Sequence, residues 1–258
     1  MSGLMFRLIA CRSDNYAVLV RDDANDTTVL VDAPAVEPVM ADLDETGWRL
    51  SHVLITHHHA DHVEGLAAIK AATGAEAIGP AGEARRITGL DRTMLDGERF
   101  LLGRIAVVAI ETPGHTAAPL CYHLPEADVA FTGDTLFALG CGRVFEGTMA
   151  DMWGSLLKLR TLLPPVTRVY CGHEYTLSNA RFAVSVDPDN AGLAARLAAT
   201  EAARAAGRPT LPTDMASEAA TNPFLRADDP AVAARLGMVG ATPAEVFAEL
   251  RTRKDNFR

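Results

Sequence analysis

The chain has 258 residues, of which 48% are hydrophobic and 22% charged, a composition typical of a globular protein with one large domain or a domain plus an appendage. Its formal net charge of −9 argues against nucleic acid as a partner, because nucleic acid favours a basic face. No apolar run reaches the length of about 18 residues that a membrane span needs. The first residues are predicted to form a strand rather than a signal peptide, so we expect a cytoplasmic protein.

The four cysteines, Cys11, Cys121, Cys141 and Cys171, form no CxxC pair. Neither a zinc knuckle nor a redox dithiol is therefore indicated. Reduced thiols agree with the cytoplasmic prediction.

Short β-rich runs alternate with turns and helices along the first two thirds of the chain. The predicted strands cover residues 5–10, 16–20, 28–32, 52–56, 105–110, 120–124, 128–133 and 168–172. Helical spacing predicts helices over residues 63–74 and 152–163. Strands interleaved with helices predict a layered α/β arrangement.

The pattern changes near residue 176, after which the chain is rich in Ala, Glu and Arg. A helix over 191–207 ends at Gly207, a second begins at Asp229-Pro230, and a capping box at Thr242 begins a third. We therefore predict a catalytic domain over residues 1–175 and a small helical domain over residues 176–258.

Metal-ligand side chains crowd the turn that follows the predicted strand 52–56. Thr56 is followed by His57, His58, His59, Ala60, Asp61 and His62. This turn leads from a strand into a helix, and α/β proteins bind ligands at that edge of a sheet. Imidazole and carboxylate groups are ligands for zinc, iron or manganese.

Three further ligand-type residues each follow a strand and a glycine. They are His115 after Gly114, Asp134 after Gly133, and His173 after Gly172. Glycine permits a tight turn and close backbone approach. Each alone is a weak signal, but their repetition after successive strands predicts one shared site.

At this point the chain resembles the metallo-β-lactamase superfamily, whose HxHxDH motif matches His57, His59, Asp61 and His62. The resemblance implies an αββα sandwich with its site at one edge, here followed by the small helical domain. It implies one metal bound by His57, His59 and His115, a second bound by Asp61, His62 and His173, and Asp134 bridging both. His58 is then expected to be structural and to point away.

Two bound cations make chemical sense because a water between them ionises near neutral pH and can attack a carbonyl. The nucleophile is then the hydroxide formed from this water, and Asp61 and Asp134 are the predicted catalytic carboxylates. We expect two divalent ions per chain, with zinc foremost and iron or manganese as alternatives. A thiolate leaving group, with a reference pKa of about 8.5, needs no strong general acid, so a thioester suits the site.

Features near the site and at the C-terminus narrow the substrate. They are the segment 140–147 with Arg143 and Phe145, Tyr175 two residues after His173, and the tail Arg251-Thr252-Arg253-Lys254-Asp255. Together with Asn222-Pro223-Phe224 they resemble the glyoxalase II (hydroxyacylglutathione hydrolase) family. The resemblance covers nearly the whole chain. It implies hydrolysis of S-D-lactoylglutathione to glutathione and D-lactate, in methylglyoxal detoxification.

By the same resemblance, glutathione is bound by Arg143, Phe145, Tyr175, Arg251 and Lys254. Cationic side chains give charge-assisted hydrogen bonds to the two carboxylates of glutathione. Where the family usually has lysine, Arg143 keeps the charge but changes the geometry. Phe145 cannot donate the hydrogen bond of the hydroxylated aromatic usual there. Basic residues also favour the C-terminal end of a helix without binding a ligand.

Other functions on the same fold are a lactonase, a persulfide dioxygenase with one iron, and a metal-free binding protein. His173 and the basic tail favour the thioester hydrolase over the dioxygenase, and the full ligand set disfavours the metal-free protein. His59 disfavours a flavin-linked diiron protein, for which a carboxylate is expected there. We expect a monomer that binds a glutathione thioester and neither nucleic acid nor membrane.

Overall fold

The computed structural model describes residues 3–257, which form two compact units. The first unit comprises the chain up to Glu111 together with Thr116–Gly133. The second comprises Thr112–His115 and the chain from Asp134 onward.

The first unit contains a mixed sheet with the strand order β1-β2-β3-β4-β5-β6. The strands β1, β2 and β3 pair antiparallel, and β3 to β6 pair parallel. The strands of this sheet, with the helices between them, are β1 (Leu4–Cys11), β2 (Asn15–Asp22), η1 (Asp23–Asn25), β3 (Thr27–Val31), α1 (Val36–Thr46), β4 (His52–Leu54), α2 (Ala60–Val63), α3 (Leu66–Thr73), β5 (Glu76–Pro80), η2 (Ala81–Glu83) and β6 (Arg92–Met94).

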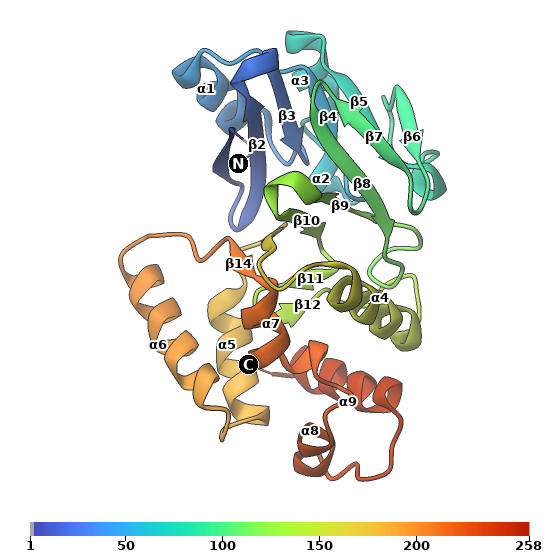
Figure 1. Ribbon diagram of the computed structural model, residues 1–258, viewed down its shortest axis with the longest axis vertical. Coiled ribbons are helices and arrows are strands. Elements are labelled where there is room, and N and C mark those ends of the chain that lie inside the picture. The colour runs from blue at the N-terminus through green and yellow to red at the C-terminus, as the bar shows by residue number, and fades with distance from the viewer. Residues whose placement is uncertain (1–2, 258) are drawn as a thin grey trace. The chain divides into compact units, whose positions relative to one another are not determined.

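Helices α1 and α3 cover one face of this sheet (Figure 1). Val39 and Leu43 of α1 and Leu66 and Ile69 of α3 share a buried cluster with side chains from β1 to β5. Every residue of β2 and β3 is buried, as expected for strands that are covered on both faces.

The other face of the sheet lies against four further strands, β7 (Arg99–Leu102), β8 (Ile105–Glu111), β9 (Leu120–Leu124) and β10 (Val129–Gly133). Each of these strands pairs antiparallel with the next one along the chain. The short helix η3 (Pro125–Ala127) connects β9 to β10. Apolar side chains of both layers meet there, among them Val20, Val29, Val107 and Phe131. Val31 and Leu54, the last residues of β3 and β4, line the same apolar layer, and the polar segments that begin at Asp32 and Thr56 follow them in sequence.

The second unit is mainly helical. Its elements are β11 (Leu136–Phe137), β12 (Gly140–Cys141), α4 (Met149–Leu162), β13 (Arg168–Cys171), α5 (Thr176–Val186), α6 (Ala191–Ala205), β14 (Thr213–Asp214), α7 (Met215–Thr221), η4 (Pro223–Leu225), α8 (Pro230–Arg235) and α9 (Pro243–Asp255).

Aromatic rings form the centre of the second unit. Phe224 of η4 lies 5.8 Å from Phe182 of α5 and 6.0 Å from Phe247 of α9 between ring centroids. Phe247 in turn lies 6.2 Å from Trp153 of α4. Helices α5 and α6 run side by side (Figure 1) and bury Ala180 against Leu193.

All eight predicted strands are confirmed, with ends that differ by a few residues, as are the helices predicted near 63–74, 152–163, 191–207, 230–237 and from Pro243. The sequence pattern did not predict the helices α1, α5 and α7, the strands β5, β6 and β7, or the two-residue strands β11, β12 and β14. Ala35 precedes α1 without a side-chain cap, so the sequence carries no start signal for that helix.

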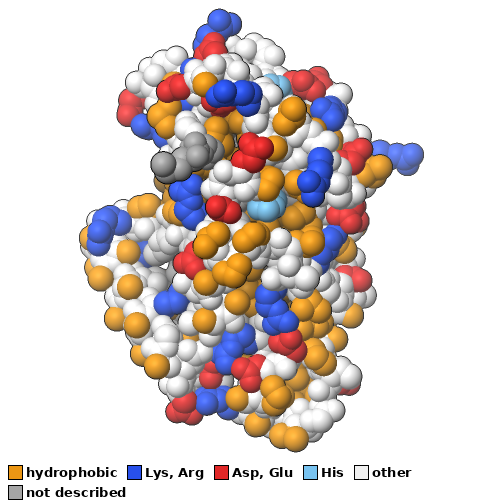
Figure 2. Space-filling model, in the orientation of Figure 1, with side chains coloured by type: hydrophobic (Ala, Val, Ile, Leu, Met, Phe, Trp, Pro, Cys, Tyr) orange, Lys and Arg blue, Asp and Glu red, His pale blue; other side chains and the backbone are white. Residues whose placement is uncertain are grey.

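Charged side chains of both signs are interspersed on the face drawn in Figure 2. None of the helices among residues 3–257 combines the length and the apolar character that crossing a membrane demands.

Candidate metal centre

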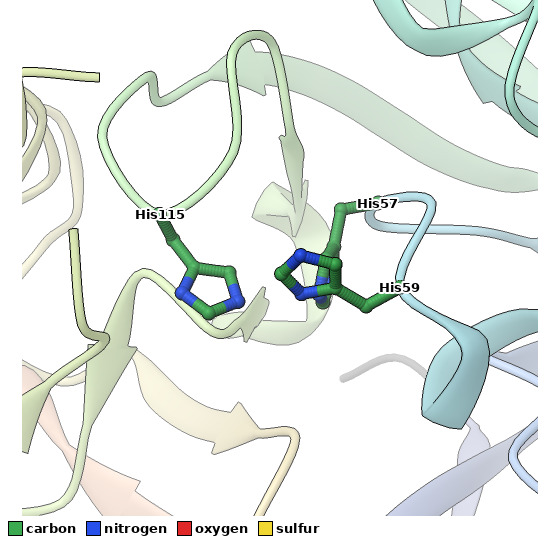
Figure 3. A group of neighbouring side chains, drawn as sticks. All are labelled: His57, His59 and His115. Atoms are coloured by element: carbon green, nitrogen blue, oxygen red, sulfur yellow. The ribbon is translucent and has the colours of Figure 1, made fainter. Parts of the chain in front are cut away.

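In the first unit, the loop between β4 and α2 brings two imidazoles together. His57 Nε2 lies 3.1 Å from His59 Nδ1, and the ring planes meet at 78° (Figure 3). Two nitrogens bound to one tetrahedral zinc lie about 3.4 Å apart. The pair is therefore spaced as two ligands of one ion would be.

Asp32, directly after β3, orients this loop. Its carboxylate accepts hydrogen bonds from the Thr56 backbone N–H (2.8 Å) and the Thr56 hydroxyl (2.9 Å), and lies 2.8 Å from His62 Nδ1. An ionised carboxylate only accepts, so His62 Nδ1 carries the hydrogen and its Nε2 keeps a lone pair. The Thr56 hydroxyl donates to Asp32, so it accepts from His57 Nδ1 at 3.0 Å. Both rings are thus held with Nε2 available to a metal, the arrangement that metal-binding histidines adopt.

Asp61 lies at the start of α2 beside His62. Its Oδ2 is 3.7 Å from His62 Nε2 and accepts a hydrogen bond from the Asn15 amide at 3.0 Å. Asn15 also donates to the Asp61 backbone carbonyl. The side chain of Asn15 therefore fixes the Asp61 carboxylate toward the imidazole of its neighbour.

His58 is oriented differently from its neighbours. Its backbone N–H donates to Glu83 Oε2 at 2.9 Å, and its Nδ1 lies 2.7 Å from the same oxygen. The other oxygen of Glu83 accepts from the Thr116 hydroxyl and from the Ala118 backbone N–H. Glu83 is 1% exposed, so this buried carboxylate ties the histidine loop to the segment that follows His115 in sequence.

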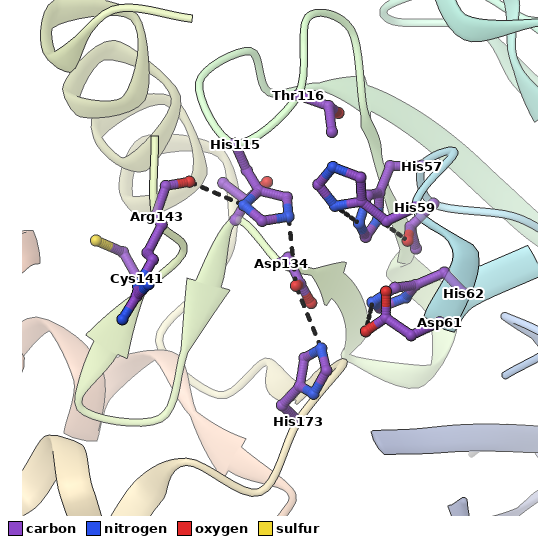
Figure 4. Close-up of polar contacts among 12 residues, drawn as sticks. His57, His59, Asp61, His62, His115, Thr116, Asp134, Cys141, Arg143 and His173 are labelled. Carbon is purple, nitrogen blue, oxygen red and sulfur yellow. Dashed lines mark hydrogen bonds and ion pairs between the residues drawn. The ribbon is translucent and has the colours of Figure 1, made fainter. Parts of the chain in front are cut away.

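In the second unit, one carboxylate oxygen faces two imidazoles. Asp134 Oδ2 lies 3.4 Å from His115 Nε2 and 3.3 Å from His173 Nε2 (Figure 4). All three side chains are buried. Ligand atoms of one metal have this separation, so a single oxygen placed between two histidines fits a bridge between two ions.

The orientation of His115 is set by a backbone carbonyl. His115 Nδ1 lies 2.8 Å from the Arg143 carbonyl oxygen (Figure 4). A carbonyl can only accept, so Nδ1 carries the hydrogen and Nε2 keeps a lone pair toward Asp134. This partner of His115 could not be found from sequence, because 28 residues separate the two.

Close packing leaves no room for a side chain at Gly114, directly before His115. Gly114 has φ 143°, and a Cβ there would lie 2.8 Å from Met152 Cα in α4. The Ser155 hydroxyl of the same helix donates to the Pro113 carbonyl at 2.7 Å. The glycine before the histidine is therefore required by the approach of α4.

Two aromatic rings adjoin the histidines of the second unit. Tyr175 stacks on His173 with ring centroids 4.7 Å apart and planes at 4°. Phe145 lies 5.3 Å from the His115 ring and is 62% exposed. Both rings are therefore solvent-exposed neighbours of these histidines.

Basic side chains gather near the end of α9. Arg143 is exposed, with Nε 3.6 Å from Asp255, and Lys254 donates to the Ser178 hydroxyl at 2.8 Å. Burial, with smaller contributions from Arg251 and Arg143, lowers the pKa of Lys254 to about 8. Arg251 differs from both because it is only 4% exposed.

Two protein-family models together match nearly the whole chain. Residues 12–173 match the metallo-beta-lactamase superfamily, and residues 174–257 match the family described as hydroxyacylglutathione hydrolase C-terminus. The hydroxyacylglutathione hydrolase of Rhizobium etli is 54% identical over 257 residues, with 100% of each chain covered.

Solved structures show the same fold. The BLEG-1 B3 metallo-beta-lactamase has a TM-score of 0.66 at 20% identity and covers 86% of this chain and 99% of its own. ETHE1 from Myxococcus xanthus has a TM-score of 0.65 at 27% identity, covering 98% and 100%. The chain therefore has a metallo-β-lactamase fold with a C-terminal helical region, and it belongs to the hydroxyacylglutathione hydrolase (glyoxalase II) family.

Proposed function

We propose that this protein hydrolyses S-(2-hydroxyacyl)glutathione, typified by S-D-lactoylglutathione, to glutathione and a 2-hydroxy acid such as D-lactate. The observation that carries the proposal is Asp134 Oδ2, which lies 3.4 and 3.3 Å from the Nε2 atoms of His115 and His173. Such a carboxylate is suited to a pair of metals. The superfamily match, together with the groups of His and Asp side chains that could hold a metal, implies a dinuclear centre of divalent ions.

The proposed ligands are those of the superfamily motif. One ion takes His57, His59 and His115, the other takes Asp61, His62 and His173, and Asp134 bridges them. The fixed tautomers of His57, His62 and His115 support this assignment, because each ring keeps Nε2 for a metal. Zinc is the proposed ion, with iron and manganese able to use the same nitrogen and oxygen donors.

The chain itself holds and orients the reacting groups. When bound, two divalent ions would supply an ionised water near neutral pH and stabilise negative charge on the thioester oxygen. The buried Cys141 is a poor nucleophile because burial raises its pKa to about 11. We therefore expect direct attack by water, with no acyl group on a side chain.

The proposed glutathione site consists of Arg143, Phe145, Tyr175, Arg251 and Lys254. Arg143 and Lys254 present cationic groups to the glutathione carboxylates, and the rings of Tyr175 and Phe145 flank the thioester. In this proposal residues 1–175 form the catalytic domain, and the helical domain of residues 176–258 adds Arg251 and Lys254 to the substrate site. The proposed setting is methylglyoxal detoxification by a cytoplasmic monomer.

The test is a comparison of two thioesters with the same acyl group. Metal-loaded protein should release thiol and D-lactate in equal amounts from S-D-lactoylglutathione, and should act far more slowly on D-lactoyl coenzyme A. Equal rates would contradict recognition of glutathione. Oxygen uptake with a persulfide, in place of thioester hydrolysis, would indicate the dioxygenase instead.

A further inference from the structure

Arg251 and Lys254 are three residues apart on α9, so they lie on the same face of the helix. This spacing predicts that both side chains bind glutathione. Their surroundings differ. Arg251 is 4% exposed, whereas Lys254 is half-buried with its ammonium group beside the Ser178 hydroxyl. A buried guanidinium needs partners for its donors within the protein.

The partners of Arg251 lie within the second unit. One terminal nitrogen donates to the Cys141 backbone carbonyl at 2.9 Å. The other terminal nitrogen and Nε both donate to Asp255 Oδ1, at 2.9 and 3.1 Å. The guanidinium also lies 5.1 Å from the centroid of the Phe224 ring. The planar group therefore joins α9 to β12 and is held in place by an aromatic face.

The Cys141 carbonyl is two residues from the carbonyl that orients His115. Between them, the Gly142 N–H donates to the Thr135 carbonyl at 3.2 Å. A Cβ on Gly142 would overlap the Asp134 carbonyl oxygen and lie 3.1 Å from His115 Nδ1. The segment from Cys141 to Arg143 is therefore packed directly against His115 and Asp134.

Two other side chains of the helical region hold the same hairpin. The Asn222 amide donates to the carbonyls of Gly140 (2.9 Å) and Phe137 (3.2 Å), and Glu218 accepts from the Leu139 N–H at 2.8 Å. Asn222 and Glu218 are fully buried. Arg251 holds the C-terminal end of this hairpin, the end nearest Arg143.

We propose that Arg251, in addition to its place in the proposed glutathione site, is a positioning residue for the metal ligand His115, and that it acts through the Cys141 carbonyl. This inference rests on the proposed function only in taking His115 as a ligand. By fixing Cys141, Arg251 keeps the Arg143 carbonyl at His115 Nδ1 and so directs His115 Nε2. Lys254 makes no contact with this hairpin among the interactions described and serves substrate affinity alone.

The test is the affinity of the full-length protein for Zn²⁺, measured by competition with a chelator, in Arg251→Met and in the matched variant Lys254→Met. Loss of a hydrogen-bond partner behind a metal-bound histidine lowers metal affinity by roughly 10–100-fold. Arg251→Met should therefore lower the affinity for one of the two Zn²⁺ ions by about tenfold. Lys254→Met should leave both affinities unchanged. In the Co²⁺-loaded protein, only Arg251→Met should change the visible absorption spectrum.

Three controls separate this effect from a general loss of structure. Thermal unfolding of the metal-free proteins reports folding, and Arg253→Met replaces an exposed arginine of the same helix. Cys141→Ala keeps the carbonyl, so it should keep the metal affinity. If Arg251→Met does not fold, Arg251→Lys replaces it, and its metal affinity should fall below that of the wild type because an ammonium lacks the planar fork.

Zinc affinities and Co²⁺ spectra of Arg251→Met equal to those of the wild type, with only KM raised, would overturn the inference and leave Arg251 with substrate binding as its only role. That outcome would leave the proposed function standing. Conversely, a wild type that binds two ions but does not hydrolyse glutathione thioesters would refute the proposed function. The role of Arg251 would still be decided by the metal affinities.

Discussion

Single side chains determine where the histidine lone pairs point. Thr56 and Asp32 fix the hydrogen on His57 and His62, and the Arg143 carbonyl fixes it on His115. Each ring therefore needs no reorganisation to meet a cation. Residues of this kind act on metal affinity without touching the metal.

Replacing Asp134 by alanine should remove both ions, because its Oδ2 lies beside both His115 and His173. Removal of a direct ligand should cost more than the roughly 100-fold upper range for an indirect partner. Elemental analysis after reconstitution measures the result. Asp189→Ala, which removes an exposed carboxylate of the same unit, serves as the control. Retention of two ions and full activity in Asp134→Ala would refute the bridging role.

Lys254 should give the substrate affinity a pH dependence. Burial lowers the pKa of Lys254 from 10.5 to about 8, so its positive charge is present below pH 8 and lost above it. We expect kcat/KM for the glutathione thioester to fall as pH rises through about 8, since this ratio reports the free enzyme. In Lys254→Arg, whose guanidinium stays charged, this fall should be absent. An identical fall in both proteins would assign it to another group.

The same shift affects stability in the opposite direction. Between about pH 8 and 10.5 the unfolded chain binds the Lys254 proton and the folded chain does not. The contribution of this group to folding stability therefore rises with pH across that window.

At the scale of elements, α4 fixes the loop that carries His115. Gly114→Ala would bring a Cβ to 2.8 Å from Met152 Cα at φ 143°, and overpacking of this kind costs about 1–3 kcal/mol. We expect lower stability to denaturant and weaker metal binding. The matched control is Gly154→Ala within α4, where a Cβ meets nothing within 4 Å. It should stabilise the protein by about 1 kcal/mol. Equal stability of the two variants would contradict the close approach.

The short helix η2 joins two loops through Glu83. Glu83→Ala would leave the N–H groups of His58 and Ala118 without their acceptor, at about 1–3 kcal/mol each. Denaturant unfolding should therefore show a loss of at least about 2 kcal/mol, with a smaller loss in Glu83→Gln, which keeps one acceptor oxygen. Unfolding at the wild-type midpoint would show that the loops do not depend on this carboxylate.

The sequence predicted the strands and the polar residues that come soon after them, because glycines mark the tight turns there. The candidate ligands His57, His115, Asp134 and His173 each lie within four residues of the end of a strand. Asp32 also ends a predicted strand and could have been found by the same rule. Glu83 could not, since it lies in a three-residue helix without periodicity. The spacing of Arg251 and Lys254 gave their common face but not their different burial, which depends on β12 from 110 residues earlier in the chain.

At the scale of the molecule, the helical region is part of the second compact unit together with residues 134–175. Asn222 and Arg251 hold β12, and Phe247 packs on Trp153. Truncation after residue 175 should therefore expose apolar surface and release the Cys141–Arg143 segment. We expect this fragment to be aggregation-prone and to bind fewer than two ions, as measured by elemental analysis. A folded fragment with two ions would show that the helical region serves the substrate alone.

We expect hydrolysis of the glutathione thioester to require two bound ions. The most direct measurement is thiol release from S-D-lactoylglutathione as metal-free protein is titrated with Zn²⁺, with bound metal counted in each sample. We predict that the rate reaches its maximum at two ions per chain. A rate that saturates at one ion, or no thiol release with two ions bound, would contradict thioester hydrolysis by a two-ion site.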